Sequence, residues 1–289
     1  MVQTADINID IQAINKTHYY HTVSANRTIM GQKTIQFVQD KVFGLTLIEK
    51  NEDNLIFNYQ LINHKMVGSG LIHEWASDME YLQEHLIIKT DKKGNFVEIL
   101  NFGEVQQKWD KKFIENLRKK YNSHKEGAKM LIEQTSLLME DLLRFQESFK
   151  GYNILRCFFQ GYFGEHGNVE ESKLNLKGYF GKIDLPLIIR SEHSSENTPE
   201  VVHRIFNTAK LDRKAFKRHE FARMLKIVTD IFDIDATLTI DMEEKYRFTP
   251  DYILKDAELF LQTYVNNWYS ITNSHELRLI DQSEIGKII

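Results

Sequence analysis

The chain has 289 residues, of which 42% are hydrophobic and 27% charged, a composition typical of a globular protein with one large core or two ordinary ones. Its net charge of −4 gives no global attraction to nucleic acid or to an anionic membrane. Cys157 is the only cysteine, which excludes an intrachain disulfide and a zinc site built from several cysteines.

The N-terminal residues carry neither a basic region nor an apolar core, so they do not resemble a secretory signal. No apolar run approaches the roughly 18 residues that a membrane-spanning helix needs. Together with the cysteine content, these features predict a cytoplasmic protein without a membrane span.

The first third of the chain has the pattern of a β-rich region. Residues 42–49 and 55–63 alternate between apolar and polar positions on either side of a polar cluster, which predicts an antiparallel hairpin. Residues 74–86 carry conflicting periods, and we expect a short helix or loop there that leads into a strand. A turn signal at 91–95 then precedes a strand over 96–100.

A long helical pattern follows between Glu104 and Phe149. Apolar or small residues recur there every three or four positions, which places them in one stripe along a helix. Gly127 and the polar residues before it are the weakest point of this run. One long helix and two helices that meet near Gly127 are equally good interpretations, and either would form a spine between two β-rich halves.

Strand signals resume after the spine. The tetrapeptide Gly-Tyr-Phe-Gly occurs at 161–164 and again at 178–181, and we expect a hairpin of 152–164 and 173–189 in which these glycines oppose one another. Residues 211–231 are predicted to form a second helix.

The last part of the chain is again extended. Residues 201–206 are predicted to form a strand, and 232–241 alternate without a break, which makes them the clearest strand in the sequence. Residues 258–271 and 276–280 are expected to be further strands.

These elements predict an α+β fold. Two antiparallel β-rich halves, residues 1–103 and 150–289, would be joined by the helical spine at 104–149, whose apolar stripe covers a sheet. No repeated strand–helix–strand rhythm supports a parallel sheet.

One short motif suggests catalysis. Residues 231–238, Ile-Phe-Asp-Ile-Asp-Ala-Thr-Leu, resemble the first motif of the haloacid dehalogenase-like phosphatases. The resemblance implies that Asp233 would be the nucleophile and Asp235 the general acid and base of an Mg²⁺-dependent phosphatase. Ala236 stands where that family has glycine, and the alternation places both carboxylates in the middle of a strand. We therefore interpret the segment as a solvated strand face.

Other candidate groups lack the expected partners. Cys157 lies in an apolar pattern, so we expect a buried and inert thiol. The histidines lack the spacing of metal ligands, and His219-Glu220 lacks the second histidine of a zinc-protease helix. We therefore predict no catalytic residue, no cofactor and no metal site.

Charge is distributed unevenly in the C-terminal half. A basic cluster precedes an acidic segment at 230–258, and a basic amphipathic helix is a possible interaction face, with a solvated helix face as the simpler interpretation. The six residues of this basic face are Arg213, Lys214, Lys217, Arg218, Arg223 and Lys226. Few aromatic residues lie among them, so we do not expect nucleic-acid binding.

The preferred functional hypothesis is a non-catalytic cytoplasmic interaction protein, a subunit or adaptor of a larger assembly, with a protein partner or a homo-oligomer. The alternative is a carrier that holds an apolar small ligand in a cavity between a sheet and a helix. The remote alternative is the Mg²⁺-dependent phosphatase that uses Asp233 and Asp235.

Overall fold

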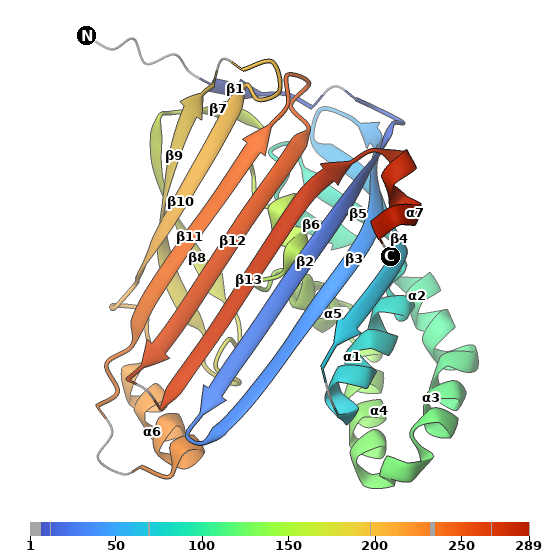
Figure 1. Ribbon diagram of the computed structural model, residues 1–289, viewed down its shortest axis with the longest axis vertical. Coiled ribbons are helices and arrows are strands. Elements are labelled where there is room, and N and C mark those ends of the chain that lie inside the picture. Colours follow the sequence, from blue (N-terminus) through green and yellow to red (C-terminus); the bar gives the residue numbers. More distant parts are fainter. Residues whose placement is uncertain are drawn as a thin grey trace.

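One antiparallel sheet of 11 strands dominates the computed structural model, which describes residues 7–11, 13–68, 70–196, 198–231, 235–266 and 268–288 (Figure 1). Strands account for 47% of the chain and helices for 29%. The strand order in the sheet is β6-β5-β4-β3-β2-β13-β12-β11-β10-β9-β8. The strands are β2 (Thr17–Met30), β3 (Lys33–Lys50), β4 (Asn54–Val67), β5 (His85–Asp91), β6 (Phe96–Ile99), β8 (Val169–Leu176), β9 (Leu185–Ser195), β10 (His203–Leu211), β11 (Thr239–Phe248), β12 (Leu254–Val265) and β13 (Tyr269–Ile280).

The sheet consists of two meanders that meet in its middle. The first runs from β2 outward to β6 at one edge, and the second runs from β8 at the opposite edge back to β13. β2 and β13 pair along their whole shared length, from Tyr19↔Ile280 to Met30↔Tyr269. The predicted fold of two separate β-rich halves joined by a helix is therefore wrong, because the edge strands of both halves pair with each other in one continuous sheet.

Alternating side chains explain why each strand forms where it does. The predicted hairpin at 42–49 and 55–63 is confirmed within β3 and β4. On β4, Leu55, Phe57 and Tyr59 are buried, while the residues between them are only partly buried. Since side chains alternate across a strand, this pattern turns one face of the sheet toward the core.

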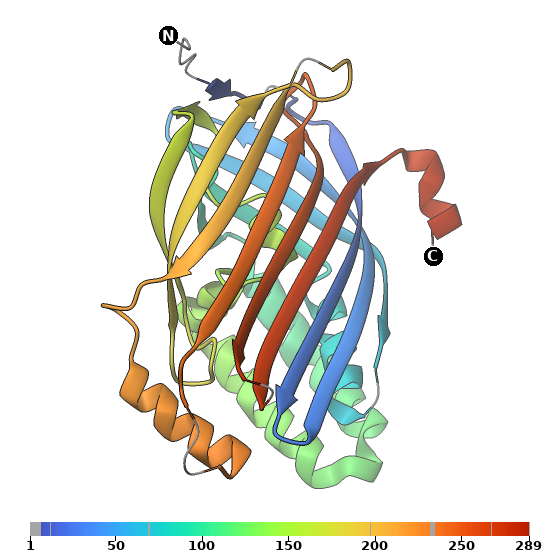
Figure 2. The same cartoon turned by 60° about the vertical axis from the view of Figure 1, so that its left-hand side comes forward.

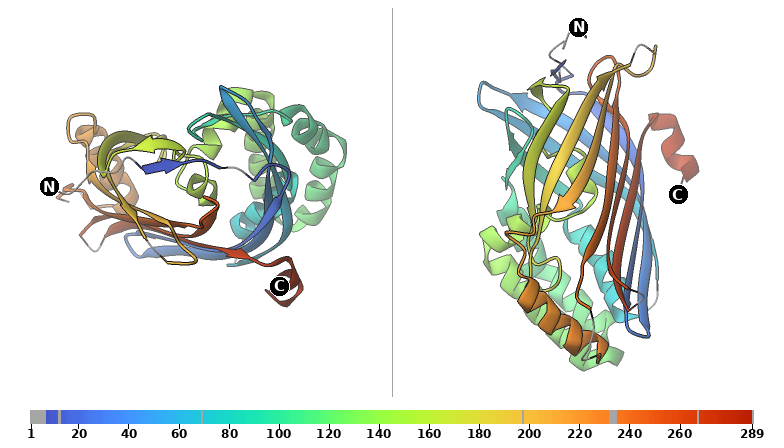
Figure 3. Two further views of the ribbon diagram at one scale, coloured as in Figure 1. Left: turned by 90° about the horizontal axis from the view of Figure 1, so that it is seen from above. Right: turned by 90° about the vertical axis from the view of Figure 1, so that its left-hand side faces the viewer.

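The sheet is strongly curved, and its concave side is covered from several directions (Figure 3). The helix α6 (Arg218–Thr229) lies across one end of β11 and β13, as Figure 2 shows. At the opposite end, β1 (Ile7–Ile9) and β7 (Gly164–His166) form a separate two-stranded antiparallel sheet.

The predicted helical spine is broken into several pieces that lie beside this sheet. Asp141 has an extended backbone and accepts a hydrogen bond from the Arg144 amide, which ends one helix and begins the next. The helices of this region and of the remaining chain are α1 (Leu71–Leu82), α2 (Phe102–Lys108), α3 (Ile114–Lys120), α4 (Lys125–Glu140), α5 (Leu142–Phe149) and α7 (Ile285–Ile288), with a π-helix at Trp109–Phe113 and 3₁₀ turns at Asn122–His124, Ile154–Cys157 and Gln282–Glu284. The prediction of a single helix or a helix pair over 104–149 is therefore wrong. Its apolar stripe is nevertheless buried, as at Trp109, Tyr121 and Phe145.

Two further predictions are corrected at their ends. The second helix, predicted over 211–231, starts only at Arg218, because β10 continues to Leu211 and Asp212 then caps a turn through the amides of Lys214 and Ala215. The strand predicted over 232–241 starts at Thr239, and residues 232–234 lie outside the described part of the chain.

The predicted glycine-paired hairpin is also wrong. Residues 154–157 form a 3₁₀ turn, and β8 pairs with β9 rather than with 152–164. Gly161, Gly164, Gly178 and Gly181 all have positive φ angles. Three of them lie in turns or bends, whereas Gly164 begins β7 and lies opposite Ile9 of β1, so no glycine of one tetrapeptide faces a glycine of the other.

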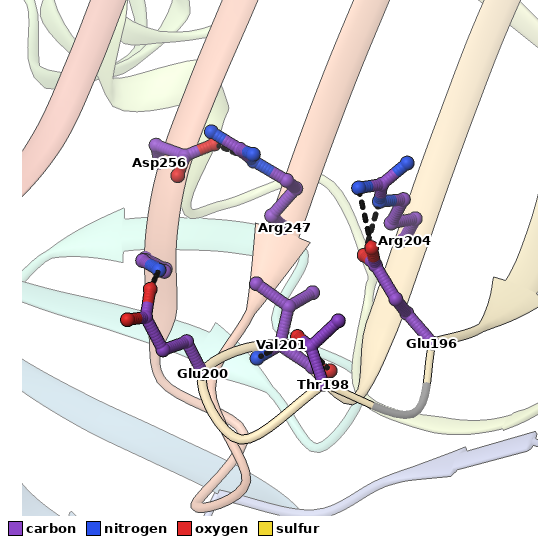
Figure 4. A network of polar contacts seen from close by, with 8 residues as sticks. Glu196, Thr198, Glu200, Val201, Arg204, Arg247 and Asp256 are labelled. Atoms are coloured by element: carbon purple, nitrogen blue, oxygen red, sulfur yellow. Dashed lines mark hydrogen bonds and ion pairs between the residues drawn. The ribbon is translucent and has the colours of Figure 1, made fainter.

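Polar contacts hold the loop between β9 and β10 against the sheet (Figure 4). Glu196 pairs with Arg204 at 2.6 Å, and Glu200 pairs with Lys255 on β12. The Val201 amide donates to the Thr198 hydroxyl at 3.1 Å. These contacts fix the upper ends of the strands that carry the candidate site. Among the described residues, no helix is both long enough and apolar enough to cross a membrane.

Candidate functional site

The concave side of the sheet holds a stretch of chain that we call the inner segment, residues 149–163. It begins with the last residue of α5, and the Asn153 side chain accepts from the Leu155 amide at 2.9 Å to start its 3₁₀ turn. Phe158 packs edge-on against Tyr20 of β2, with ring centroids 4.8 Å apart. Phe159 packs against Phe57 of β4 at 5.3 Å. The inner segment therefore fills the concave face of the N-terminal meander.

A cleft of about 390 Å³ remains between the inner segment and the strands β8–β10, and we call it the interior cleft. Its volume falls within the roughly 300–1,000 Å³ of typical ligand pockets. The apolar lining on one side of the cleft is supplied by Phe96, Phe149, Leu155 and Phe159. The opposite side is formed by β9 and β10, with Ile189, Ser191, His193, Ile205 and Asn207.

A second, apolar pocket of about 40 Å³ lies on the other side of the inner segment. Leu45, Leu47 and Phe248 contribute to its lining, and Phe158 contributes from the inner segment. Tyr162 lines both this pocket and the interior cleft, so this residue borders both spaces.

A buried polar network lies under the interior cleft. Glu244 of β11 is fully buried, and its carboxylate accepts from Arg156 Nε at 3.0 Å. The same carboxylate accepts from Asn207 and from the Tyr246 hydroxyl, each at 2.9 Å. Gln160 donates in turn to that hydroxyl at 2.5 Å. The network ties the inner segment to β10 and β11, and Arg156, Asn207 and Gln160 also line the cleft.

Cys157 is buried beside this network. Burial, followed by the charge of Glu244, raises the pKa of its thiol well above the ordinary value. The thiol is therefore protonated, which makes it a poor nucleophile.

Two histidines and a glutamate meet on the wall of the cleft. One ligand atom from each of His166, Glu170 and His193 lies within 4.8 Å of the other two. The His166 Nδ1 atom is 3.4 Å from Glu170 Oε2, and its Nε2 atom is 2.9 Å from the Tyr162 carbonyl. The rings of His166 and His193 stack 4.6 Å apart. Within the described residues, this is the one group of three or more His, Cys, Asp or Glu side chains that could bind a metal ion.

His203 of β10 contacts this group through His193. Its Nε2 atom lies 3.4 Å from His193 Nδ1. Burial, followed by the neighbouring imidazoles, lowers the pKa of both His193 and His203 to about 4. Both rings are therefore neutral at pH 7. Partial burial opposes a low pKa at Glu170, but the Gly167 amide and His166 hold its pKa below the ordinary value.

The residues singled out in the sequence lie elsewhere. The six basic residues are all exposed, on α6 and on the turn before it, away from the interior cleft, so the interaction face stays a prediction. Asp233 lies outside the described residues. Asp235 is exposed, and its carboxylate accepts from the amide and the hydroxyl of Thr237.

Sequence reasoning missed both Glu244 and the histidine group. Glu244 had a usable signal, because it occupies an inward position of β11 between Met242 and Tyr246. His166 and Glu170 are four residues apart across a turn, a spacing with no metal signature in extended chain, and His193 follows a strand later.

No protein-family model and no curated protein sequence matches the chain. Among solved structures, one that describes lipid–protein interactions in lipovitellin matches 94% of this chain at a TM-score of 0.52 and 11% identity. The chain spans about a quarter of that protein's length, since the match covers 26% of lipovitellin. This likeness establishes a shared fold.

Weaker matches include DynF from the dynemicin biosynthesis pathway of Micromonospora chersina, at a TM-score of 0.22 and 5% identity, covering 98% of this chain and 90% of that one. A DUF1329 family protein from Desulfovibrio piger matches at a TM-score of 0.15 and 6% identity, covering 95% of this chain and 93% of that one. Structural similarity this weak implies neither a common fold nor a common function.

The prediction that this chain is an interaction protein, a subunit or adaptor of a larger assembly, is wrong. That hypothesis was based on the lack of a catalytic signature, on a long connecting helix and on segregated charge. The chain instead forms one curved sheet with a cleft on its concave side, and it shares its fold with a protein described for its lipid–protein interactions.

Proposed function

We propose that this protein is a carrier that holds an apolar or amphipathic small ligand between the concave face of the sheet and the inner segment. The observation that carries the proposal is the interior cleft, which combines phenyl rings on one side with polar groups on the other. Ligand pockets typically have this make-up, with an apolar lining and a few placed polar groups that fix orientation.

The lining suggests how a ligand would lie. Its apolar portion would contact Phe149 and Phe159, whereas its polar end would lie near Arg156 and Asn207. Arg156 already pairs with Glu244 through Nε, which leaves the rest of its guanidinium to meet an acceptor on the ligand. The lipid contacts described for lipovitellin, whose fold this chain shares in part, support the same ligand class.

The smaller apolar pocket offers a route to a longer ligand. At about 40 Å³ it does not hold an acyl chain by itself. Tyr162 borders both spaces, and a movement of its side chain is how we propose that a longer ligand would reach from one to the other.

Native mass spectrometry of freshly purified protein, combined with extraction of bound lipid, tests the proposal directly. We expect a bound species that solvent extraction removes, and saturable binding of a fluorescent long-chain fatty acid to the stripped protein. A protein that is empty when purified and shows no saturable binding contradicts the proposal.

A pair of substitutions on β9 locates the binding. Ser191 faces the cleft, whereas Arg190 next to it is exposed on the other face of the strand. Ser191→Phe fills the cleft, so we expect at least tenfold weaker binding of the fatty acid. Arg190→Phe adds the same ring outside the cleft and should leave the affinity unchanged. Equal affinities for the two variants contradict binding in this cleft.

A further inference from the structure

Three side chains that could ligate a metal converge on the wall of the interior cleft from separate elements. His166 ends β7, Glu170 is the second residue of β8, and His193 lies on β9. His166 and His193 are 8% and 7% exposed, while Glu170 is exposed toward solvent. Pairing of β8 with β9, which sets Val169 opposite Glu192, brings Glu170 and His193 close together. His166 belongs to β7, which pairs with β1.

The hydrogen bond of His166 determines which of its atoms is free. Its Nε2 atom lies 2.9 Å from the Tyr162 carbonyl oxygen, and a carbonyl only accepts, so Nε2 carries the hydrogen. In the neutral ring Nδ1 then holds a lone pair. That lone pair faces Glu170 Oε2 at 3.4 Å, which is also an acceptor. Two acceptors that face each other repel unless a proton or a cation lies between them.

Glu170 is oriented for this contact by its other oxygen. Oε1 accepts from the Gly167 amide at 2.9 Å, so Oε2 stays directed at His166. His193 has a comparable support, because its Nδ1 lies 3.4 Å from Nε2 of His203. When His193 donates Nδ1–H to His203, its Nε2 lone pair is left for a ligand. Such outer contacts commonly fix the orientation of metal-binding side chains.

We propose that His166, Glu170 and His193 bind one divalent transition-metal cation at the wall of the interior cleft. One proton bridges two acceptors, whereas a cation satisfies all three. Imidazole nitrogens with one carboxylate suit zinc and its neighbours in the first row, while magnesium and calcium prefer oxygen ligands.

The spacing fits a zinc ion. Zinc binds histidine nitrogen at about 2.0–2.1 Å, so two ligand atoms on a tetrahedral ion lie about 3.4 Å apart. His166 Nδ1 and Glu170 Oε2 already have this separation of 3.4 Å. One ligand atom of each residue lies within 4.8 Å of the other two, so a side-chain movement of about 1.4 Å or less brings the third ligand to the tetrahedral spacing.

Three protein ligands leave a fourth position open, as in zinc sites that bind an exchangeable water or substrate. Because all three residues line the interior cleft, that position is reachable from the cleft. The proposal stands without the carrier function, since it depends on metal binding alone.

Titration of the metal-free protein with zinc chloride by calorimetry tests the site. We expect one equivalent to bind, and cobalt(II) to give the intense visible absorption of a four- or five-coordinate ion. Glu170→Gln keeps an acceptor for the Gly167 amide on an exposed side chain, so this variant should fold and bind zinc at least tenfold more weakly. His193→Ala should weaken binding to a similar or larger extent.

His85→Ala is the matched control, because His85 is an exposed histidine 3.8 Å from a carboxylate oxygen of Glu104. Its removal should leave the zinc affinity unchanged. The proposal is overturned if Glu170→Gln binds zinc as tightly as the wild type, or if cobalt(II) shows only the weak spectrum of a six-coordinate ion.

Discussion

The carboxylate of Glu244 lies on the inward face of β11, in line with Met242, Tyr246 and Phe248. It has three hydrogen-bond donors within 3.0 Å, one of which is the guanidinium of Arg156. A buried charge is tolerated only when it is paired and hydrogen-bonded. Glu244 and Arg156 each give the other an opposite charge and a hydrogen bond. The pair also connects the inner segment to the sheet.

Replacing Glu244 with glutamine removes the counter-charge of Arg156 while keeping the shape of the side chain. We expect the free energy of unfolding to fall by about 3–5 kcal/mol, since the guanidinium stays buried without its partner. Urea denaturation measures this loss. Glu243→Gln on the exposed face of β11 is the control and should change stability by no more than about 0.5 kcal/mol. Equal effects of the two substitutions would contradict the role of the pair.

His275 of β13 gives a second expectation, which concerns pH. Its Nδ1 atom is 2.8 Å from the Ser24 hydroxyl, and its buried Nε2 atom has no hydrogen-bond partner. Burial, followed by the charge of Lys41, lowers the pKa of this ring from 6.5 to about 4. Between these two values the unfolded chain binds a proton that the folded protein does not.

Stability should therefore fall as the pH drops from about 6.5 to 4, with His275 responsible for about 3 kcal/mol of the loss. His275→Gln removes this titration, so the stability of the variant should depend less steeply on pH in that window. Thermal or urea unfolding of both proteins at pH 7, 5.5 and 4.5 provides the comparison. Parallel curves for the two proteins would rule out the lowered pKa.

Among the elements, α6 has one buried apolar face and one solvent-exposed basic face. Phe221 and Leu225 are completely buried, and the Phe221 ring packs against Phe180 at 4.8 Å and Tyr269 at 6.2 Å. The opposite face carries Arg223 and Lys226 into solvent. The helix therefore closes one end of the concave side through its aromatic anchor.

Phe221→Ala removes that anchor and should cost about 3–5 kcal/mol, because the neighbouring rings cannot fill the cavity that it leaves. Chemical denaturation measures the loss. Ile227 on the same helix is 83% exposed, so Ile227→Ala should have an effect within about 0.5 kcal/mol. A small loss for Phe221→Ala would mean that α6 is not held by its buried face.

The helical region shows what periodicity does and does not reveal. The apolar stripe between Glu104 and Phe149 predicted helix and identified the buried face, as at Trp109 and Tyr121. It did not reveal the interruptions, because the spacing of apolar residues continues across them. Asp141 is a recognisable cap residue, so its position could have indicated one of the breaks.

For the whole molecule, alternation located many strands but could not determine which edges pair. The hairpin of β3 and β4 is local and was predicted, whereas the contact between β2 and β13 joins the two ends of the described chain. Register is set by facing partners, and no partner is visible in a strand considered alone.

The candidate site was hidden for the same reason. Its parts come from β7, β8, β9 and the inner segment, which only the completed sheet brings together. The hypotheses about Asp235 and the basic residues relied on residues that are close in sequence. The cleft, in contrast, is formed by residues that are distant in sequence and meet only in the folded sheet.

The pairing of β2 with β13 also has a kinetic consequence. Tyr19 and Ile280 are opposite each other in the sheet, so this seam can close only after synthesis has passed Ile280. Contacts between such distant residues cost loop-closure entropy before they gain any stability, which makes folding slow. Until the seam forms, each meander exposes an unpaired edge, and this interval is when the chain is most prone to aggregation.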